Sequence, residues 1–273
     1  MLAKILIDNA AGDGLCAEWG LSIWLEYREH CFLLDAGATE KFAENATAMG
    51  LHLADASFGV LSHAHYDHAD GLGAFFAQNR HAPVYLRRGA AENCYRREGL
   101  HLHYIGIRRG YLEQYQARFR YVDGVFSPEP GVTLLPHSTP GLSAAGRRAG
   151  MYIRNRGTLL PRPDSFAHEQ TLVLEAADGL VVFNSCSHGG ADCILQEVAV
   201  AFPGRRICAF VGGLHLFRST EQEVRALARR LRDVGITALY TGHCTGERAI
   251  ALLREELGDG VHQFYSGMEI QIN

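Results

Sequence analysis

His63-Ala64-His65-Tyr66-Asp67-His68-Ala69-Asp70-Gly71 directly follows an apolar run at 58–61, and the rest of the chain can be interpreted from this stretch. If a strand continues to His65, the side chains of His63 and His65 project to the same side, because side chains alternate along a strand. Asp67 and His68 then lie where the chain turns and can face the same point from another direction. Imidazole and carboxylate ligands together suit zinc, manganese or iron. A solvated, histidine-rich turn is the alternative, but this density of ligands predicts a metal site that can serve two ions.

The composition indicates a globular chain without a nucleic-acid-binding surface. Of its 273 residues 47% are hydrophobic, which is enough for a large buried core. The net charge is −4 at pH 7, so the chain lacks the basic field that binding to nucleic-acid phosphates requires. Arginine pairs such as Arg96-Arg97 could meet a small anionic substrate, although an ordinary solvated surface explains most such pairs. We therefore expect a small-molecule substrate and no nucleic-acid partner, and the sequence leaves the oligomeric state open.

The N-terminal residues and the cysteines indicate the compartment. Residues 1–9 lack the basic and long apolar segments of a signal peptide, and no apolar run approaches the length of a membrane span. The seven cysteines are widely spaced and form no Cys-x-x-Cys pair, which favours reduced thiols over a disulfide framework. The expected location is the cytoplasm, without membrane contact.

Strands and helices are expected to alternate on both sides of a less regular middle region. Before it, the pattern predicts strands at 4–7, 21–27, 31–34, 58–61 and 84–86 and helices at about 39–49 and 72–78. After it, an Asp-Gly turn predicts a hairpin of strands at 171–175 and 180–184. The remaining expected elements are a helix at 191–202, a strand at 207–211, a helix opened by a capping box at 220–223, a strand at 236–240 and a helix to about 257.

The middle region, about 87–165, is expected to be an insert or lid within a single domain that spans 1–273. A helix is expected after Gly89, and an arginine- and tyrosine-rich segment follows at 101–121. After four prolines, the segment at 141–157 is predicted to be an excursion from the core. Long loops of this kind are often functional, and disorder is the competing interpretation.

Three further histidines share one setting in the C-terminal half. His188, His215 and His243 each lie in a Gly- or Ser-rich loop that directly follows an apolar strand. In layered α/β sheets, ligands gather at the carboxyl ends of strands, so these loops and the first cluster could converge on one rim. Taken singly, each of them is more typical of a structural histidine than of a metal ligand.

The His-x-His-x-Asp-His stretch, together with Leu33-Leu34-Asp35-Ala36-Gly37 and the late histidines, resembles the metallo-β-lactamase superfamily. More narrowly, the chain is similar to the branch that includes the archaeal 7,8-dihydropterin-6-methyl-4-(β-D-ribofuranosyl)-aminobenzene-5′-phosphate synthase. The motifs that carry this narrower likeness are Tyr104-Ile105-Gly106-Ile107, Glu169-Gln170-Thr171-Leu172-Val173, Ser185-Cys186-Ser187-His188, Gly212-Gly213-Leu214-His215-Leu216 and Gly242-His243-Cys244-Thr245-Gly246. The resemblance extends from Ile5 to the end of the chain.

The resemblance implies an α+β fold, namely a four-layer αβ/βα sandwich in which two sheets face each other with helices outside. It also implies a binuclear site with two divalent metal ions in the groove between the sheets, zinc first, with manganese or iron as alternatives. The implied ligands are His63, His65 and His188 for one ion, and Asp67, His68 and His243 for the other. Asp35 matches a position that supports the first cluster from behind the ligands, where carboxylates commonly orient histidines.

One departure from the superfamily pattern concerns the bridging ligand. Most hydrolases of the superfamily place a bridging aspartate at the end of the strand that matches 180–184, where this chain has Ser185-Cys186. Cys186 could be a soft ligand, or it could simply pack while water supplies the bridge. In a second register, His168 would fill the position assigned to His188. We prefer His188, because its loop is short, flanked by glycine and directly follows a strand.

The expected function is that of a metal-dependent hydrolase acting on a small, phosphorylated or ester-containing metabolite through a metal-activated water. Asp67 would ligate and orient the nucleophile, and His215 would act as general acid or hold a phosphate oxygen. The first alternative is a synthase that joins a pterin diphosphate to an aminobenzene ribosyl phosphate. Others are an iron-dependent oxidoreductase or dioxygenase and a non-catalytic binding module on the same fold.

Overall fold

The first sheet is antiparallel at one side and parallel at the other. In the computed structural model, which describes residues 1–272, its strand order is β18-β1-β2-β3-β4-β5-β8. These strands are β1 (Leu2–Ile7), β2 (Ser22–Tyr27), β3 (His30–Leu34), β4 (Phe58–Val60), β5 (Val84–Arg87), β8 (Phe119–Val122) and β18 (Glu269–Gln271). A tight turn joins β2 to β3, whereas the crossovers to the parallel strands β4 and β5 contain the helices α1 (Lys41–Ala48) and α3 (Leu72–Gln78).

The second sheet repeats this plan with the order β17-β16-β15-β14-β13-β10-β9. Its strands are β9 (Phe126–Glu129), β10 (Val132–Pro136), β13 (Gln170–Ala176), β14 (Gly179–Phe183), β15 (Ile207–Val211), β16 (Ala238–Thr241) and β17 (Val261–Gln263). The β13–β14 hairpin forms at the expected Asp-Gly turn. The crossovers between parallel strands contain α6 (Ala191–Ala201), α7 (Glu221–Val234) and α8 (Glu247–Leu257), and the predicted capping box of Thr220 and Glu223 opens α7.

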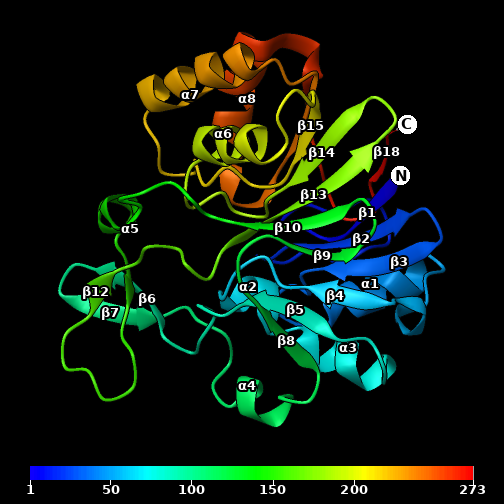
Figure 1. Cartoon of the computed structure of the whole chain (residues 1–273), viewed down its shortest axis with the longest axis vertical. Helices are drawn as coiled ribbons and strands as arrows, with labels where there is room; N and C mark the ends of the chain where they lie inside the picture. The colour runs from blue at the N-terminus through cyan, green and yellow to red at the C-terminus, as the bar shows by residue number, and fades with distance from the viewer. Residues whose placement is uncertain (273) are drawn as a thin grey trace.

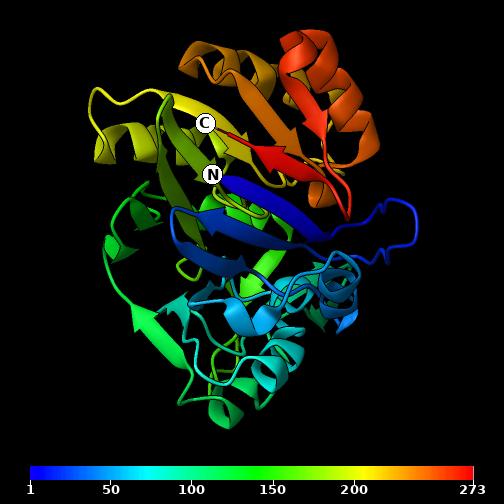
Figure 2. The same cartoon turned by 90° about the vertical axis from the view of Figure 1, so that its right-hand side faces the viewer.

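The two sheets face each other, and the helices cover their outer faces (Figures 1 and 2). Inward-facing side chains of both sheets, such as Ile23, Leu34, Leu172 and Phe183, form one fully buried cluster. A second cluster lies between the first sheet and helices α1 and α3, and a third joins the second sheet to α6, α7 and α8. Three apolar interfaces between four layers confirm the predicted αβ/βα sandwich.

Within the expected insert, about 87–165, β8, β9 and β10 belong to the two large sheets, and the rest builds a third, smaller sheet with the order β12-β11-β6-β7. It consists of β6 (Cys94–Glu98), β7 (His101–Tyr104), β11 (Met151–Ile153) and β12 (Arg162–Pro163), and the short helices α4 (Tyr111–Gln114) and α5 (Ser143–Ala149) lie in the same region. The helix expected after Gly89 is therefore wrong, because this segment forms β6 instead. Tyr95 of β6 pairs with Tyr152, a contact between residues far apart in sequence that no local periodicity reveals. Whether the region acts as a lid stays a prediction.

The remaining regular segments are short turns of helix. They are α2 (Tyr66–Ala69), η1 (Leu53–Asp55), η2 (His243–Thr245) and η3 (Gly258–Gly260). No helix within residues 1–272 is both long and apolar enough to cross a membrane.

Candidate metal centre

The histidines singled out in the sequence converge at the carboxyl ends of parallel strands. His63 and His65 follow β4 of the first sheet, whereas His188, His215 and His243 follow β14, β15 and β16 of the second. Strands β4, β14 and β15 are apolar and buried throughout, and β16 is buried at alternate residues. The site therefore lies at the shared rim of the two sheets, as expected for layered α/β structures.

Asp35 fixes two of these histidines from behind. Its carboxylate accepts hydrogen bonds from the backbone N–H and the hydroxyl of Ser62, at 2.7 and 2.6 Å, and from Nδ1 of His68 at 2.8 Å. Because the Ser62 hydroxyl donates to Asp35, its oxygen can accept from Nδ1 of His63, which lies 2.8 Å away. Both imidazoles are thereby held as the tautomer that directs the Nε2 lone pair into the site. This is the second-layer support that metal-binding histidines usually have.

His63, His65 and His188 form the first group. Their ligand atoms all lie within 4.8 Å of one another. Nε2 of His63, Nε2 of His65 and both ring nitrogens of His188 are buried and have no hydrogen-bond partner among residues 1–272. Buried polar atoms are normally paired, so this concentration of unpaired imidazole nitrogens fits a bound cation.

Asp67, His68 and His243 form the second group. Nδ1 of His243 donates to the side-chain oxygen of Asn9 at 3.2 Å, which turns its Nε2 toward Nε2 of His68, also 3.2 Å away. An Asp67 carboxylate oxygen lies 3.5 Å from Nε2 of His243 and 3.9 Å from Nε2 of His68. Two imidazole lone pairs that face each other at this distance repel unless a proton or a cation lies between them, so this group also fits a metal ion.

Burial and mutual proximity set the protonation of the first group. Burial first, and then the neighbouring imidazoles, lower the pKa of His63 and of His188 well below the usual value and the pKa of His65 to about 3. At neutral pH these side chains are therefore uncharged, which is the form that binds metal.

Asp67 and His243 of the second group are charged instead. Burial would raise the pKa of Asp67, but His68 and His243 outweigh it and hold that pKa below its ordinary value. Burial would also lower the pKa of His243, yet hydrogen bonding to Asp67 raises it to about 9. Without metal, a proton on His243 thus occupies the place that a cation would take.

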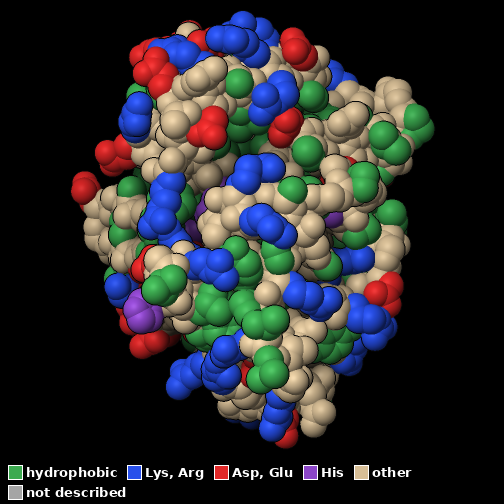
Figure 3. Space-filling model, turned by 90° about the vertical axis from the view of Figure 1, so that its left-hand side faces the viewer, with side chains coloured by type: hydrophobic (Ala, Val, Ile, Leu, Met, Phe, Trp, Pro, Cys, Tyr) green, Lys and Arg blue, Asp and Glu red, His purple; other side chains and the backbone are tan. Residues whose placement is uncertain are grey.

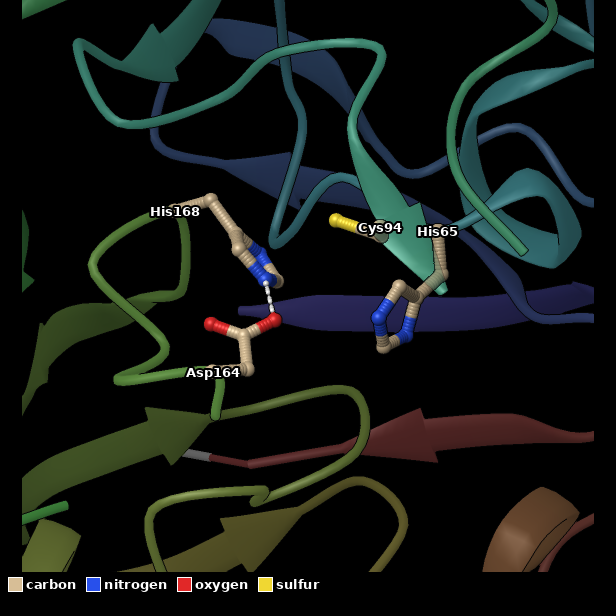
Figure 4. Close-up of side chains that lie close together, drawn as sticks. All are labelled: His65, Cys94, Asp164 and His168. Atoms are coloured by element: carbon tan, nitrogen blue, oxygen red, sulfur yellow. Dashed lines mark hydrogen bonds and ion pairs between the residues drawn. The ribbon is translucent and has the colours of Figure 1, made fainter. Parts of the chain in front are cut away.

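The two candidates for the mid-chain ligand, His168 and His188, differ in their hydrogen bonds. Nδ1 of His168 accepts the backbone N–H of Ala64 at 3.1 Å, so its Nε2 carries the proton and donates to Asp164 at 2.9 Å (Figure 4). His168 therefore has no free lone pair to offer a metal, whereas both nitrogens of His188 lack a partner within the described residues. The geometry favours His188, and it makes His168 a support for the segment between His63 and His65.

Cys186 lies between the two groups. Its Sγ is 3.2 Å from Nε2 of His68 and 3.4 Å from Sγ of Cys244. The same sulfur falls within 4.8 Å of ligand atoms of His63 and His68, and within 4.8 Å of those of His188 and His215. The thiol thus lies where a bridging ligand would be expected.

A cavity of about 300 Å³ opens beside these residues. Its lining combines site residues with apolar and aromatic side chains: Trp19, His65, Tyr66, Asp67, Arg96, Ile105, Met151, Cys186, His188, His215, Phe217, His243 and Cys244. His215 is partly exposed here, its Nδ1 has no partner within residues 1–272, and its ring centroid is 4.5 Å from that of His188. A substrate in this cavity would reach Asp67 and His215 together.

Backbone strain is concentrated in the same place. Asp35, Ser187, His215 and His243 all have positive φ angles, between 48° and 59°, although none of them is glycine. Such conformations cost free energy and persist where the surrounding structure enforces them, often at functional sites.

Side chains outside the expected ligand set also position the site. Glu169 accepts the backbone N–H groups of His188 and Gly189, at 3.0 and 3.1 Å, and its carboxylate contacts Nε2 of His137. Nδ1 of His137 is in turn 2.9 Å from a carboxylate oxygen of Glu197. Asn9, His137 and Glu197 reach the site from other parts of the chain, so only the folded structure reveals their contribution.

Comparison with known proteins agrees with this geometry. A family model described as the metallo-β-lactamase superfamily matches residues 20–147. The crystal structure of Tm1679, described as a metal-dependent hydrolase of the β-lactamase superfamily, superposes with a TM-score of 0.86 at 28% sequence identity and covers 100% of this chain and 99% of the other. The chain has the metallo-β-lactamase fold, and its N-terminal part matches the model of that superfamily.

Two further proteins are less similar to this chain. The 7,8-dihydropterin-6-methyl-4-(β-D-ribofuranosyl)-aminobenzene-5′-phosphate synthase of Methanocaldococcus jannaschii is 22% identical over 229 residues, which cover 78% of this chain and 74% of the synthase. The protein YhfI of Bacillus subtilis shares the metallo-β-lactamase fold with a TM-score of 0.57 at 12% identity, and the match covers 98% of both chains. The superfamily generally binds divalent metal ions, in keeping with the clustered histidines.

Proposed function

We propose that this protein is a metal-dependent hydrolase that acts on a small, phosphorylated or ester-containing metabolite. The observation that carries the proposal is the set of buried imidazole nitrogens without partners within residues 1–272, which come from both sheets and of which those of His65, His188 and His215 border one cavity. The similarity to Tm1679, a metal-dependent hydrolase of the β-lactamase superfamily, supports the proposal, because the two chains are 28% identical and the match covers the whole of this chain.

In this proposal His63, His65 and His188 hold one divalent ion, and Asp67, His68 and His243 hold the other. Zinc suits this mixture of imidazole and carboxylate, with manganese or iron as alternatives. Divalent ions bound there would supply hydroxide at neutral pH and offset negative charge that develops on the substrate.

The protein's own residues have separate roles. Asp67 is ionised and borders the cavity, so it can orient the attacking water and accept its proton. The ring of His215 lies beside that of His188, with 4.5 Å between their centroids. His215 can protonate the leaving group or donate a hydrogen bond to a phosphate oxygen. Trp19 and Phe217 line the cavity and limit access of water to the bond that reacts.

The test is hydrolysis by the purified protein after it has been stripped of metal and reloaded with Zn²⁺, Mn²⁺ or Fe²⁺. A panel of phosphomonoesters, phosphodiesters, carboxylic esters and lactones should contain substrates whose turnover requires the added metal. We expect His215→Ala to lower kcat on the best substrate by about a hundredfold, which is typical for loss of a general acid. Unchanged turnover in His215→Ala would remove that residue from the mechanism, and metal-independent turnover would contradict the proposal itself.

A second candidate is the synthase reaction, which the relative from Methanocaldococcus jannaschii favours by aligning with 78% of this chain. It would use the same metal centre to activate a diphosphate leaving group. Incubation with a pterin diphosphate and an aminobenzene ribosyl phosphate separates the two, because release of diphosphate that depends on the second substrate indicates transfer instead of hydrolysis.

A further inference from the structure

A second, larger groove adjoins the metal cavity. Its volume is about 680 Å³, and it shares Arg96, His188, His215 and Phe217 with the cavity. Its walls come from the end of α5, the loops after β14 and β15, and the first turns of α6 and α7. Lys and Arg side chains are prominent across the middle of the face that carries α5 (Figure 3). A molecule that reacts in the cavity could therefore extend into this groove.

The groove gathers positive charge that acidic side chains leave largely unpaired. Five arginines line it: Arg96, Arg97, Arg148, Arg218 and Arg230. The two acidic side chains of the lining are already engaged, because Asp192 binds Arg230 at 2.6 Å and Glu223 closes the capping box of α7. In a chain with a net charge of −4, such local excess of guanidinium groups is a specific feature of this groove.

Two of these arginines converge on one ring at the boundary with the metal cavity. The guanidinium carbons of Arg96 and Arg218 lie 5.9 and 5.4 Å from the centroid of Phe217. The nearest carboxylate contact of Arg96 within the described residues is Glu98, at 3.7 Å. Burial, followed by repulsion from Arg218, lowers the pKa of Arg96. An anion placed between them would relieve this repulsion.

The N-terminus of α6 adds a second source of positive potential. This helix has 11 residues and begins after Gly190, no side chain of residues 1–272 caps it, and its first turn lines the groove. The loop before it admits no side chain at Gly189, because a Cβ there would lie 2.4 Å from the ring of His137. His188, an expected metal ligand, is part of the same lining, so the groove reaches the metal centre. Uncapped helix N-termini bind anions through their free N–H groups.

We propose that this groove binds a phosphate group that the substrate keeps throughout the reaction, while the bond that is cleaved lies in the adjacent cavity. This inference rests on the proposed function only in placing the bond that is cleaved in the metal cavity. Phosphate fits better than a carboxylate, because a tetrahedral dianion can accept from two guanidinium groups and from helix N–H groups together. The volume of the groove exceeds that of phosphate itself, which leaves room for a sugar-sized group between the phosphate and the metal centre.

The first experiment measures binding of inorganic phosphate to the metal-free protein, so that affinity for a metal does not contribute. Calorimetric titration should show saturable binding, and Arg96→Gln and Arg218→Gln should each weaken it about tenfold, since each removes a charge-assisted hydrogen bond. Arg205→Gln is the matched control, because Arg205 is exposed and pairs with Glu175 at 3.0 Å outside the groove. Thermal unfolding of each variant confirms that the fold is intact. Equal phosphate affinity in all four proteins, or no binding at all, overturns the proposal.

The second experiment compares phenyl acetate with 4-acetoxyphenyl phosphate as substrates of the metal-loaded protein, by release of acetate. The phosphate-bearing ester should have a KM at least tenfold lower, and Arg218→Gln should raise that KM toward the value for phenyl acetate with a smaller change in kcat. If neither ester is cleaved but arginine-dependent phosphate binding persists, the proposed hydrolysis fails and the groove stands. If both esters are cleaved with the same KM, the phosphate site is wrong while the hydrolase proposal survives.

Discussion

Cys186 is the residue at which this site departs furthest from an aspartate-bridged centre. Its sulfur lies 3.2 Å from Nε2 of His68, and it is within reach of ligand atoms from both histidine groups. A thiolate is a soft ligand that binds Zn²⁺ at about 2.3 Å and also suits Co²⁺. The side chain that bridges the two groups therefore decides how tightly a second metal ion binds.

We expect Co²⁺-loaded protein to show a thiolate-to-cobalt charge-transfer band in the near ultraviolet. Cys186→Ser should abolish the band and weaken binding of one Co²⁺ equivalent about tenfold or more. Cys208→Ser is the control, because Cys208 is a buried thiol of β15 that donates to the backbone oxygen of Leu180 at 3.2 Å, and this variant should keep the band. Cys186→Asp should restore binding without the band. A band that survives in Cys186→Ser would show that this thiol only packs.

His137 gives a prediction about pH. Burial would lower its pKa, but Glu169 and Glu197 outweigh this effect and raise that pKa to about 9. Because the pKa is higher in the folded than in the unfolded protein, the stabilisation is fully present below pH 6.5 and is lost as pH rises through about 9. The free energy of unfolding of the wild type should exceed that of His137→Gln by about 1.5–3 kcal/mol at pH 6.

Urea unfolding at pH 6, 8 and 10 measures this difference, which should shrink at pH 10. His103→Gln is the control, since His103 is 57% exposed and has only a 3.5 Å contact with Glu98. A difference that is constant from pH 6 to pH 10 would contradict a charged His137 in the folded protein.

At the scale of elements, the segment 164–170 connects the ligand loops of the two sheets. His168 accepts the N–H of Ala64 between the expected ligands His63 and His65. The next residue, Glu169, points the other way and accepts the N–H of His188. Gln170 donates to the backbone oxygen of Leu61 at 2.8 Å. Three consecutive side chains thus set the positions of ligand loops that the sequence separates by more than a hundred residues.

Asp164→Asn should disturb this segment through a tautomer change. Asp164 accepts the N–H of Phe166 through one oxygen and the proton on Nε2 of His168 through the other. An asparagine whose oxygen still accepts the N–H of Phe166 turns its NH₂ group toward Nε2 of His168. Nε2 must then accept, so the histidine proton moves to Nδ1. There it repels the N–H of Ala64, because both groups are donors. We expect Zn²⁺ affinity, measured by competition with a chelator, to fall 10- to 100-fold.

The control for this prediction is Asp123→Asn, since Asp123 is an exposed partner of Arg88, 2.6 Å away. It should leave the affinity for Zn²⁺ unchanged. A second variant, His168→Asn, can keep the acceptor for Ala64 and should retain more affinity than His168→Leu. If Asp164→Asn binds Zn²⁺ as the wild type does, Asp164 and His168 contribute only to the core.

The elements differ in how far the sequence could predict them. The β13–β14 hairpin and α7 could be predicted because their signals are local, an Asp-Gly turn and a capping box. β6 could not, because its sequence Cys94-Tyr95-Arg96-Arg97-Glu98 shows no apolar alternation, and of its two partner strands, the adjacent β7 and the distant β11, the second lies more than fifty residues further along the chain. The same division holds for the site. The strand-end histidines have a local signal, whereas Asn9 and His137 act through contacts that exist only after the sheets pack.

At the scale of the whole molecule, the two sheets are joined by an apolar interior and end in a polar rim. Inward-facing residues such as Ile23 and Phe183 are fully buried between the sheets, and this burial is the main source of stability. The first sheet contributes His63, His65, Asp67 and His68 to the rim, and the second contributes His188 and His243. Packing of the sheets therefore sets the distances within each ligand group, and a metal ion held by such a group would in turn link the sheets.

This linkage predicts that metal stabilises the entire fold. Metal ions that bind only the folded state raise the free energy of unfolding by about 2.7 kcal/mol per site at a free concentration one hundred times the dissociation constant. The effect should be large here because the nitrogens of His63 and His188 are buried without partners among residues 1–272. Urea unfolding should show a higher midpoint with saturating Zn²⁺ than with a chelator, at unchanged slope. The double variant His63→Ala/His188→Ala should lose the part of this shift that belongs to the first ion, and the part that remains measures the second group. Equal midpoints with Zn²⁺ and with chelator in the wild type would mean that the rim is already complete without metal, and the unpaired imidazoles would then need another ligand.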